Sequence, residues 1–279
     1  MTLPPSGPFL KWAGGKRKVV SALLPHLPPS FRTYHEPFVG GGALFFALAA
    51  PRLRPFQHAI LSDANLRLVR TWQAVRDDVE SVIARLEVHA SSHSRDHFLA
   101  VRKSAPDGSP DPADVAAWLI YLNKTAFNGL YRVNRRGVFN VPFGRYANPT
   151  ICNSGLLQAV SRTLDGVEVR HAPFEATLDL AEAGDVVYFD PPYVPRSATS
   201  SFTSYTEGCF GPEDQVRLRD VALALADRGV RVVLSNHDTP GVRDLYRPPF
   251  SLFRVEVARF INSQGDRRGT VPELVIVAG

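Results

Sequence analysis

Three consecutive glycines, Gly40 to Gly42, constrain the fold more than any other feature of this sequence. They follow a strand-like segment, Thr33 to Phe38, and precede an apolar run, Ala43 to Ala50, that suits a buried helix. A glycine turn between a strand and a helix lets the backbone approach a nucleoside-type ligand at the carboxyl end of a sheet. The segment therefore predicts the ligand-binding unit of an α/β fold.

The same alternation of strands and helices continues along the chain. The further strand candidates are Ala59 to Leu61, Asp185 to Phe189, Val230 to Leu234 and Leu274 to Val277, and the helical segments between them include Asn65 to Arg76 and Glu213 to Asp227. Strands that alternate with helices predict an α/β fold built on a doubly wound, mostly parallel sheet.

A stretch of different character separates two such blocks. Asp77 to Tyr121 has helical periodicity interrupted by a turn-rich loop, Ser104 to Pro110. The segments Tyr131 to Val133 and Val138 to Asn140 flank a basic turn and predict a β-hairpin. We therefore expect a catalytic domain made of residues 1–70 and 150–279, with residues 71–149 inserted as a second domain.

Composition limits the cellular setting without naming a partner. The net charge of +5 and the pI near 9.4 are compatible with a polyanionic partner. Two cysteines, Cys152 and Cys209, are too few for a disulfide framework and lack the spacing of a zinc site, so no metal is expected. No signal pattern or membrane-length apolar run is present, and we expect a cytoplasmic protein.

The segment Asp190-Pro191-Pro192-Tyr193 follows a buried strand and carries the candidate chemistry. Two prolines stiffen the turn and leave their carbonyls free to point into a pocket. Hydrogen bonds from an aromatic amine to the Asp190 carboxylate and a proline carbonyl would localise the nitrogen lone pair toward a methyl donor. Tyr193 would stack on a base that has left the duplex. The alternative is a strand-ending turn with a buried tyrosine.

The glycine turn and Asp63 each have a structural alternative. Phe38-Val39-Gly40-Gly41-Gly42 does not fit the G-x-G-x-x-G spacing, so NAD is disfavoured, and a plain structural turn stays open. Asp63 ends the second strand, where a carboxylate accepts hydrogen bonds from ribose hydroxyls. It could equally cap the helix that follows.

Four segments together resemble the Dam-type, D12 class adenine-N6 DNA methyltransferases of the α group. They are Phe9 to Lys16, His35 to Gly42, Asn128 to Tyr146, and Asp190 to Tyr193. The resemblance covers nearly the whole chain and implies a Rossmann-like catalytic domain, S-adenosylmethionine as the methyl donor and double-stranded DNA as the substrate. It implies a bacterial or phage source, and a cognate restriction endonuclease is a candidate partner.

The resemblance also implies roles for individual residues. Those expected to line the methyl-donor site are Trp12, Lys16, Glu36, Phe38, Gly40, Gly42, Asp63 and Asp190. Without the family, Trp12 and Lys16 would be a core tryptophan and a solvated lysine.

The segment Asn128 to Tyr146 resembles the family's target-recognition region. The residues expected to read bases or wedge strands are Asn128, Leu130, Arg132 and Tyr146. Arg132 suits a guanine edge, whereas Arg135 and Arg136 suit phosphates; a solvated hairpin tip is the alternative. Relatives with this segment commonly methylate the adenine of GATC. The chain departs from the family pattern at Tyr131 and in its longer Ser104 to Pro110 loop.

Two further segments have weaker interpretations. Ser235-Asn236-His237-Asp238 is interpreted as a strand-to-helix turn beside the pocket and not as catalytic His-Asp machinery, and Phe202 and Tyr205 resemble a loop that holds flipped DNA. Two rival functions stay open: a methyltransferase for RNA or a protein amide, and a catalytically silent DNA-binding protein.

Overall fold

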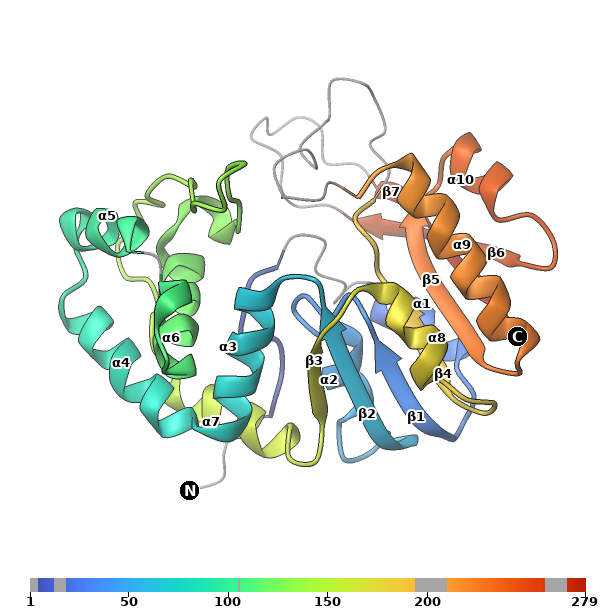
Figure 1. Cartoon of the computed structure of the whole chain (residues 1–279), viewed down its shortest axis with the longest axis horizontal. Helices are drawn as coiled ribbons and strands as arrows, with labels where there is room; N and C mark the ends of the chain where they lie inside the picture. The colour runs from blue at the N-terminus through green and yellow to red at the C-terminus, as the bar shows by residue number, and fades with distance from the viewer. Residues whose placement is uncertain (1–4, 13–18, 105, 194–209, 259–269) are drawn as a thin grey trace.

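The computed structural model describes residues 5–12, 19–104, 106–193, 210–258 and 270–279, and these contain one seven-stranded sheet (Figure 1). Its order is β3-β2-β1-β4-β5-β7-β6. The strands are β1 (Phe31–Glu36), β2 (Phe56–Asp63), β3 (Glu168–His171), β4 (Val186–Phe189), β5 (Arg231–His237), β6 (Ser251–Ala258) and β7 (Thr270–Ala278). Strands β1 to β5 pair in parallel, and β7 is antiparallel to β5 and β6. The expected doubly wound, mostly parallel sheet is confirmed.

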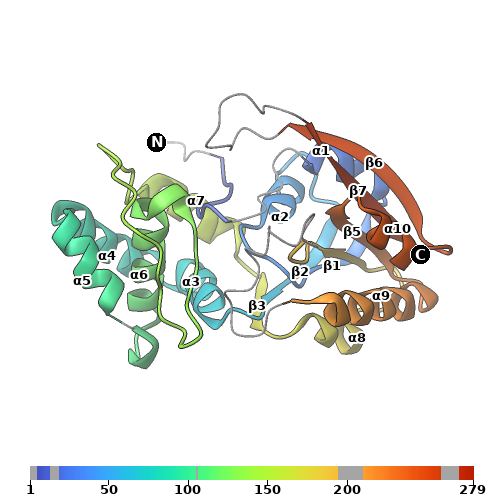
Figure 2. The same cartoon turned by 90° about the horizontal axis from the view of Figure 1, so that it is seen from above.

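Helices cover both faces of the sheet. They are α1 (Val20–Leu23), α2 (Ala43–Leu48), α3 (Leu66–Asp77), α4 (Val79–Ser91), α5 (Arg95–Lys103), α6 (Pro112–Thr125), α7 (Ser154–Thr163), α8 (Thr177–Leu180), α9 (Pro212–Asp227) and α10 (Pro240–Leu245). Figure 2 shows α8 and α9 on one face of the sheet and α1 and α2 on the other. None of these helices is long and apolar enough to cross a lipid bilayer.

Strand β4 shows why the sheet has two hydrophobic faces. Val186 and Tyr188 belong to the core cluster that includes α2 and α3, whereas Val187 and Phe189 belong to the cluster that includes α9. All four side chains are buried. Because successive side chains of a strand point to opposite faces, a continuous apolar run is the pattern required of a strand covered on both sides.

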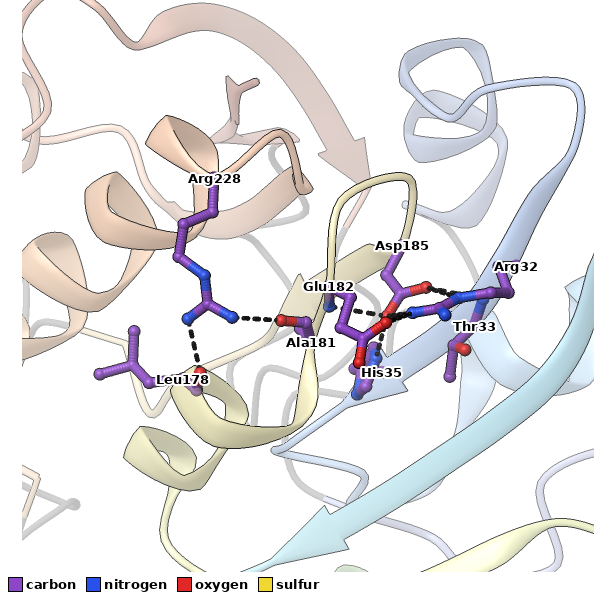
Figure 3. Close-up of polar contacts among 8 residues, drawn as sticks. All are labelled: Arg32, Thr33, His35, Leu178, Ala181, Glu182, Asp185 and Arg228. Atoms are coloured by element: carbon purple, nitrogen blue, oxygen red, sulfur yellow. Dashed lines mark hydrogen bonds and ion pairs between the residues drawn. The ribbon is translucent and has the colours of Figure 1, made fainter.

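A buried carboxylate joins the start of β4 to β1 (Figure 3). Asp185 accepts hydrogen bonds from the backbone N–H of Thr33 at 3.1 Å and from Arg32 Nε at 3.2 Å, and it contacts His35 Nε2 at 3.1 Å. His35 and Asp185 are both 1% exposed. These contacts fix the register of the two strands whose carboxyl ends carry the glycine turn and the Asp190 tetrad.

The helical character of the inserted stretch is confirmed. Helices α4, α5 and α6 lie together at one end of the molecule, away from β5 to β7 (Figure 1). The Ser104 to Pro110 loop separates α5 from α6, and its described residues include a short 3-10 turn, Pro106–Gly108. The predicted boundary at residues 70–71 lies inside α3, whose buried side chains share one core cluster with both the sheet and the insert.

The hairpin prediction needs correction. Val133 and Phe139 form one isolated β-bridge, and neither flanking segment is a strand. Asn134 N–H donates to the Val138 carbonyl at 2.9 Å, and Gly137 N–H donates to Asn134 at 2.9 Å. The turn therefore forms where expected, and Asn140 N–H still donates to the Arg132 carbonyl at 3.0 Å beyond the bridge, but the pairing is too short to form strands. We call residues 131–140 the recognition hairpin below.

Candidate functional site

The glycine turn is packed between two tryptophans. Gly40 and Gly42 have positive φ angles of 46° and 64°, a conformation that glycine adopts without a steric penalty. A Cβ atom would lie 2.7 Å from Trp12 at Gly40 and 2.5 Å from Trp72 at Gly42. Trp72 Nε1 also donates to the Gly40 carbonyl at 3.2 Å. Packing alone thus requires both glycines, so the turn by itself is not evidence of a ligand.

Asp63 connects the end of β2 to this turn. Its carboxylate accepts hydrogen bonds from Gly40 N–H at 3.3 Å and Asn65 N–H at 2.9 Å. The cap of α3 is Asn65, whose side chain accepts from Leu68 N–H at 3.2 Å, so the alternative that Asp63 is the N-cap is wrong. Burial raises the pKa of Asp63 to about 6.

Glu36 ends β1 directly beside the tetrad strand. It is 3% exposed and accepts a hydrogen bond from Tyr34 Oη at 2.9 Å. Burial, reinforced by the neighbouring charge of Asp190, raises the pKa of Glu36 to about 8. Phe38, two residues further on, stacks on Phe174 with ring centroids 5.6 Å apart.

The tetrad begins at the carboxyl end of β4, and hydrogen bonds from neighbouring strands hold it. Ser235 Oγ on β5 donates to Asp190 Oδ1 at 2.9 Å and lies 3.0 Å from Tyr188 Oη. Tyr193 Oη donates to Glu273 Oε2 on β7 at 3.1 Å, and its ring meets His237 edge-on at 4.6 Å. The acid and the aromatic ring are therefore oriented by separate strands.

One of the two proline carbonyls already has a partner. Gln215 Nε2, on α9, donates to the Pro192 carbonyl at 3.2 Å, and Asn236 Nδ2 donates to Gln215 Oε1 at 3.2 Å. The expectation that both carbonyls are free is therefore wrong for Pro192.

Ser235, Asn236 and His237 also lie differently from the expectation. They are the last residues of β5, not a strand-to-helix turn, and α10 begins later, at Pro240. Because β5 is the parallel neighbour of β4, Ser235 contacts Asp190 and His237 contacts Tyr193. Asn236 is linked to Pro192 through Gln215. The expected position beside the site is right, and their role there is structural support.

The recognition segment, Asn128 to Tyr146, begins with an exposed turn whose backbone is left-handed. Asn128 is exposed with φ 55° and ψ 15°, and Gly129 next to it has φ 65°. Leu130 follows and is 40% exposed. Left-handed backbone at a non-glycine residue is maintained only where surrounding structure requires it. Tyr146, at the end of the segment, lies under Lys11 Nζ, 5.2 Å from its ring centroid.

The arginines of the recognition hairpin differ in how firmly they are held. Arg132 is partly buried, and its Nε donates to Asn140 Oδ1 at 2.7 Å. Arg135 and Arg136 are exposed at the turn. A held side chain suits the reading of a base edge, whereas exposed ones suit phosphates.

Comparison with known proteins identifies the family. The model of the D12 class N6 adenine-specific DNA methyltransferases matches residues 12–261. The chain belongs to this family. As a D12 methyltransferase it is an adenine-specific DNA methyltransferase, and the family implies S-adenosylmethionine as methyl donor and DNA as substrate.

Relatives of this D12 methyltransferase match over nearly their whole length. The Type II methyltransferase M1.LlaDCHI of Lactococcus lactis subsp. cremoris is 40% identical, covering 96% of this chain and 94% of the relative. The DNA adenine methylase of Escherichia coli (strain K12) is 35% identical, covering 96% and 93%. The Type II methyltransferase M.MjaIII of Methanocaldococcus jannaschii is 40% identical, covering 94% of each.

The D12 methyltransferase structure brings together several of the residues named from sequence. Trp12, the glycine turn and Asp63 are in contact, and Asp190 lies near Glu36. Lys16, Phe202, Tyr205 and Cys209 lie outside the described residues.

The sequence did not reveal the supporting roles of three residues, Gln215, Ser235 and Glu273. They come from elements far from the tetrad in sequence. Polar residues within otherwise apolar strand and helix segments were the available signal, because buried polar groups require hydrogen-bond partners.

Proposed function

We propose that this methyltransferase acts on the N6 amine of an adenine flipped out of duplex DNA, with Asp190, Pro191, Pro192 and Tyr193 as the catalytic tetrad. The observation that carries this proposal is the support of Asp190 by Ser235 beside the glycine turn. Ser235 orients the Asp190 carboxylate at the carboxyl end of β4, and this carboxylate is the acceptor that we assign to an N6 proton. Family membership supplies adenine as the substrate base.

Each tetrad residue has a separate role toward the base. The Asp190 carboxylate and the Pro191 carbonyl accept the two N6–H groups, which localises the nitrogen lone pair. Tyr193 stacks on the flipped ring, and its hydroxyl bond to Glu273 fixes the plane of its own ring. Pro192, bonded to Gln215, stiffens the segment and does not receive the amine.

We assign the methyl-donor site to the pocket edge formed by β1, β2 and β4. Its residues are Trp12, Lys16, Glu36, Phe38, Gly40, Gly42, Asp63 and Asp190. S-adenosylmethionine supplies an electrophilic methyl group there. Asp63 would accept ribose hydroxyls. A bound cationic donor would favour the ionised forms of the buried acids Glu36 and Asp63, because an opposite charge nearby stabilises the charged form.

We assign DNA recognition to residues 71–149, with GATC as the target, and methyl transfer to residues 1–70 and 150–279. Asn128 and Leu130 would enter the duplex, Arg132 and Tyr146 would read bases, and Arg135 and Arg136 would contact phosphates. The exposed, left-handed Asn128 supports the first role. The fixed Arg132 supports the second.

Single-molecule sequencing of DNA from cells that express the protein tests substrate and context together. N6-methyladenine confined to GATC supports both assignments. N6-methyladenine in another context would overturn GATC alone. Unmodified DNA from cells in which the protein labels RNA or protein would overturn the choice of substrate.

A further inference from the structure

Arg67, in the first turn of α3, joins three separate parts of the chain. Its Nε and Nη2 bind the two carboxylate oxygens of Asp107 at 2.6 and 2.5 Å. Its Nη1 donates to the Gly137 carbonyl at 2.8 Å and to Tyr131 Oη at 3.4 Å. The guanidinium also lies over the Trp118 ring, 5.1 Å from the centroid.

The Arg67 side chain is largely buried and held in a defined geometry. The Arg67 side chain is only 15% exposed, and its bidentate hydrogen bonding to Asp107 raises its pKa. A guanidinium presents its donors in a rigid planar fork, which serves a carboxylate on one side and a carbonyl on the other. A lysine ammonium at this position can pair with Asp107 but cannot span both partners.

The hydrogen-bond partners of Arg67 lie in separate segments of the inserted stretch. Tyr131 is in the recognition hairpin, and Asp107 is in the loop between α5 and α6. Gly137 belongs to the turn that carries Arg135 and Arg136. One side chain thus connects the loop between α5 and α6 to the tip of the recognition hairpin.

Arg67 is also close in sequence to Asp63, a residue of the proposed methyl-donor site. Helix α3 starts three residues after Asp63, which contacts the glycine turn. Tyr131 stacks on Trp12 with ring centroids 5.3 Å apart, and Trp12 packs against Gly40. The recognition hairpin is therefore attached to the catalytic sheet by an aromatic stack and by the Arg67 fork.

We propose that Arg67 is a specificity-determining positioning residue, which fixes the recognition hairpin relative to the tetrad so that base reading and methyl transfer engage the same adenine. This inference rests on the proposed function of the hairpin in DNA recognition. Small displacements of such supports cost catalysis heavily, since misplacement by about 1 Å can lower rates by about a hundredfold.

The test compares Arg67→Lys and Arg67→Gln with the wild type and with Arg70→Gln. Arg70 is the matched control, because it lies on the same helix as Arg67. Its Nη1 donates to the Asp107 carbonyl at 3.2 Å, a bond that does not involve the recognition hairpin. Two quantities are measured: the ratio of kcat/KM on a GATC duplex to that on duplexes with one base changed, and amide hydrogen exchange of residues 131–140.

Both Arg67 variants should lose discrimination by about tenfold or more, mainly through a lower kcat on the GATC duplex. Arg67→Lys should do so while keeping the melting temperature, because it retains the pairing with Asp107. Exchange of residues 131–140 should quicken in both variants and not in Arg70→Gln. Binding of S-adenosylhomocysteine without DNA should stay unchanged.

Wild-type discrimination in both Arg67 variants would overturn the inference, and so would an equal loss in Arg70→Gln. The exchange measurement needs no DNA, so it separates this inference from the proposed function. If the wild type methylates no duplex adenine, the proposed function fails. Unchanged exchange in the Arg67 variants would independently refute the positioning role.

Discussion

At the scale of single residues, Ser235 orients Asp190, the proposed catalytic carboxylate. It donates to Asp190 Oδ1 at 2.9 Å, and Tyr188 lies behind it. Ser235→Ala should lower kcat by about tenfold, since one hydrogen bond to a charged group is lost, while KM for S-adenosylmethionine stays near that of the wild type. Steady-state kinetics measure both constants. An unchanged kcat would show that Asp190 needs no such support.

The raised pKa of Glu36 predicts that the stability of the fold depends on pH. Its folded pKa of about 8 lies above its ordinary value of 4.5, so the folded state holds this proton more tightly than the unfolded state does. The resulting stabilisation is complete below pH 4.5 and is lost as the pH rises through about 8. Glu36→Gln, which cannot ionise, should therefore gain stability relative to the wild type between pH 5 and 9.

Urea unfolding without added methyl donor, at several pH values in that range, measures this difference. The free energy of unfolding of Glu36→Gln minus that of the wild type should increase with pH. A difference in free energy of unfolding that stays constant over these pH values would mean that Glu36 is already ionised in the folded protein at neutral pH.

At the scale of elements, the start of β4 is fixed by Asp185. Burial alone would raise the pKa of this acid, but hydrogen bonds from Arg32, the Glu182 N–H and His35 outweigh it and lower the pKa (Figure 3). Its stabilisation is therefore present at neutral pH and is lost as the pH falls below its ordinary value. Asp185→Ala should cost about 3–5 kcal/mol, because buried donors lose their acceptor.

Glu182→Gln is the control, because Glu182 meets the same Arg32 but is 68% exposed. Its cost should stay below about 1 kcal/mol. Urea unfolding at pH 7 measures both values. Similar small costs for the two variants would contradict the view that Asp185 fixes the register of β1 and β4.

Sequence patterns predicted the central elements of the fold but missed elements at its edges. Buried strands such as β4 are continuous apolar runs, so Val186 to Phe189 was recognisable. The edge strands β3 and β6 were missed because exposed charged residues interrupt their apolar pattern, as Arg254 and Glu256 do in β6. The hairpin turn and the pairing next to it were predicted, but not how short this pairing is, because turn residues predict a turn and not the length of its arms.

At the scale of the whole molecule, the proposed methyl-donor site spans the ends of β1, β2 and β4, so its occupancy should stabilise the entire fold. S-adenosylhomocysteine at about 100 times its Kd should stabilise the protein by about 2.7 kcal/mol, raising the melting temperature by roughly 5 °C or more. Asp63→Ala should abolish most of this ligand-dependent shift, whatever its own melting temperature. A full shift in Asp63→Ala would remove Asp63 from the site.

The site itself was predictable where motifs are continuous in sequence and not where it depends on pairing between distant segments. Asp190 to Tyr193 and the glycine turn stand out locally. Ser235 and Glu273 acquire their roles through the sheet order β4-β5-β7, which brings Tyr193 and Glu273, 80 positions apart, into contact. Gln215 acquires its role through the position of α9 beside Pro192. Arg67 could not be recognised for the same reason.

Methyl transfer by purified protein is the most direct test of the central assignment. Wild-type protein and Asp190→Ala are incubated with labelled S-adenosylmethionine and a duplex containing one GATC site, or with total RNA. The assignment predicts label in N6-methyladenine of the duplex and a loss of at least about a hundredfold in Asp190→Ala. Label confined to RNA, or equal labelling of the duplex by both proteins, would contradict it.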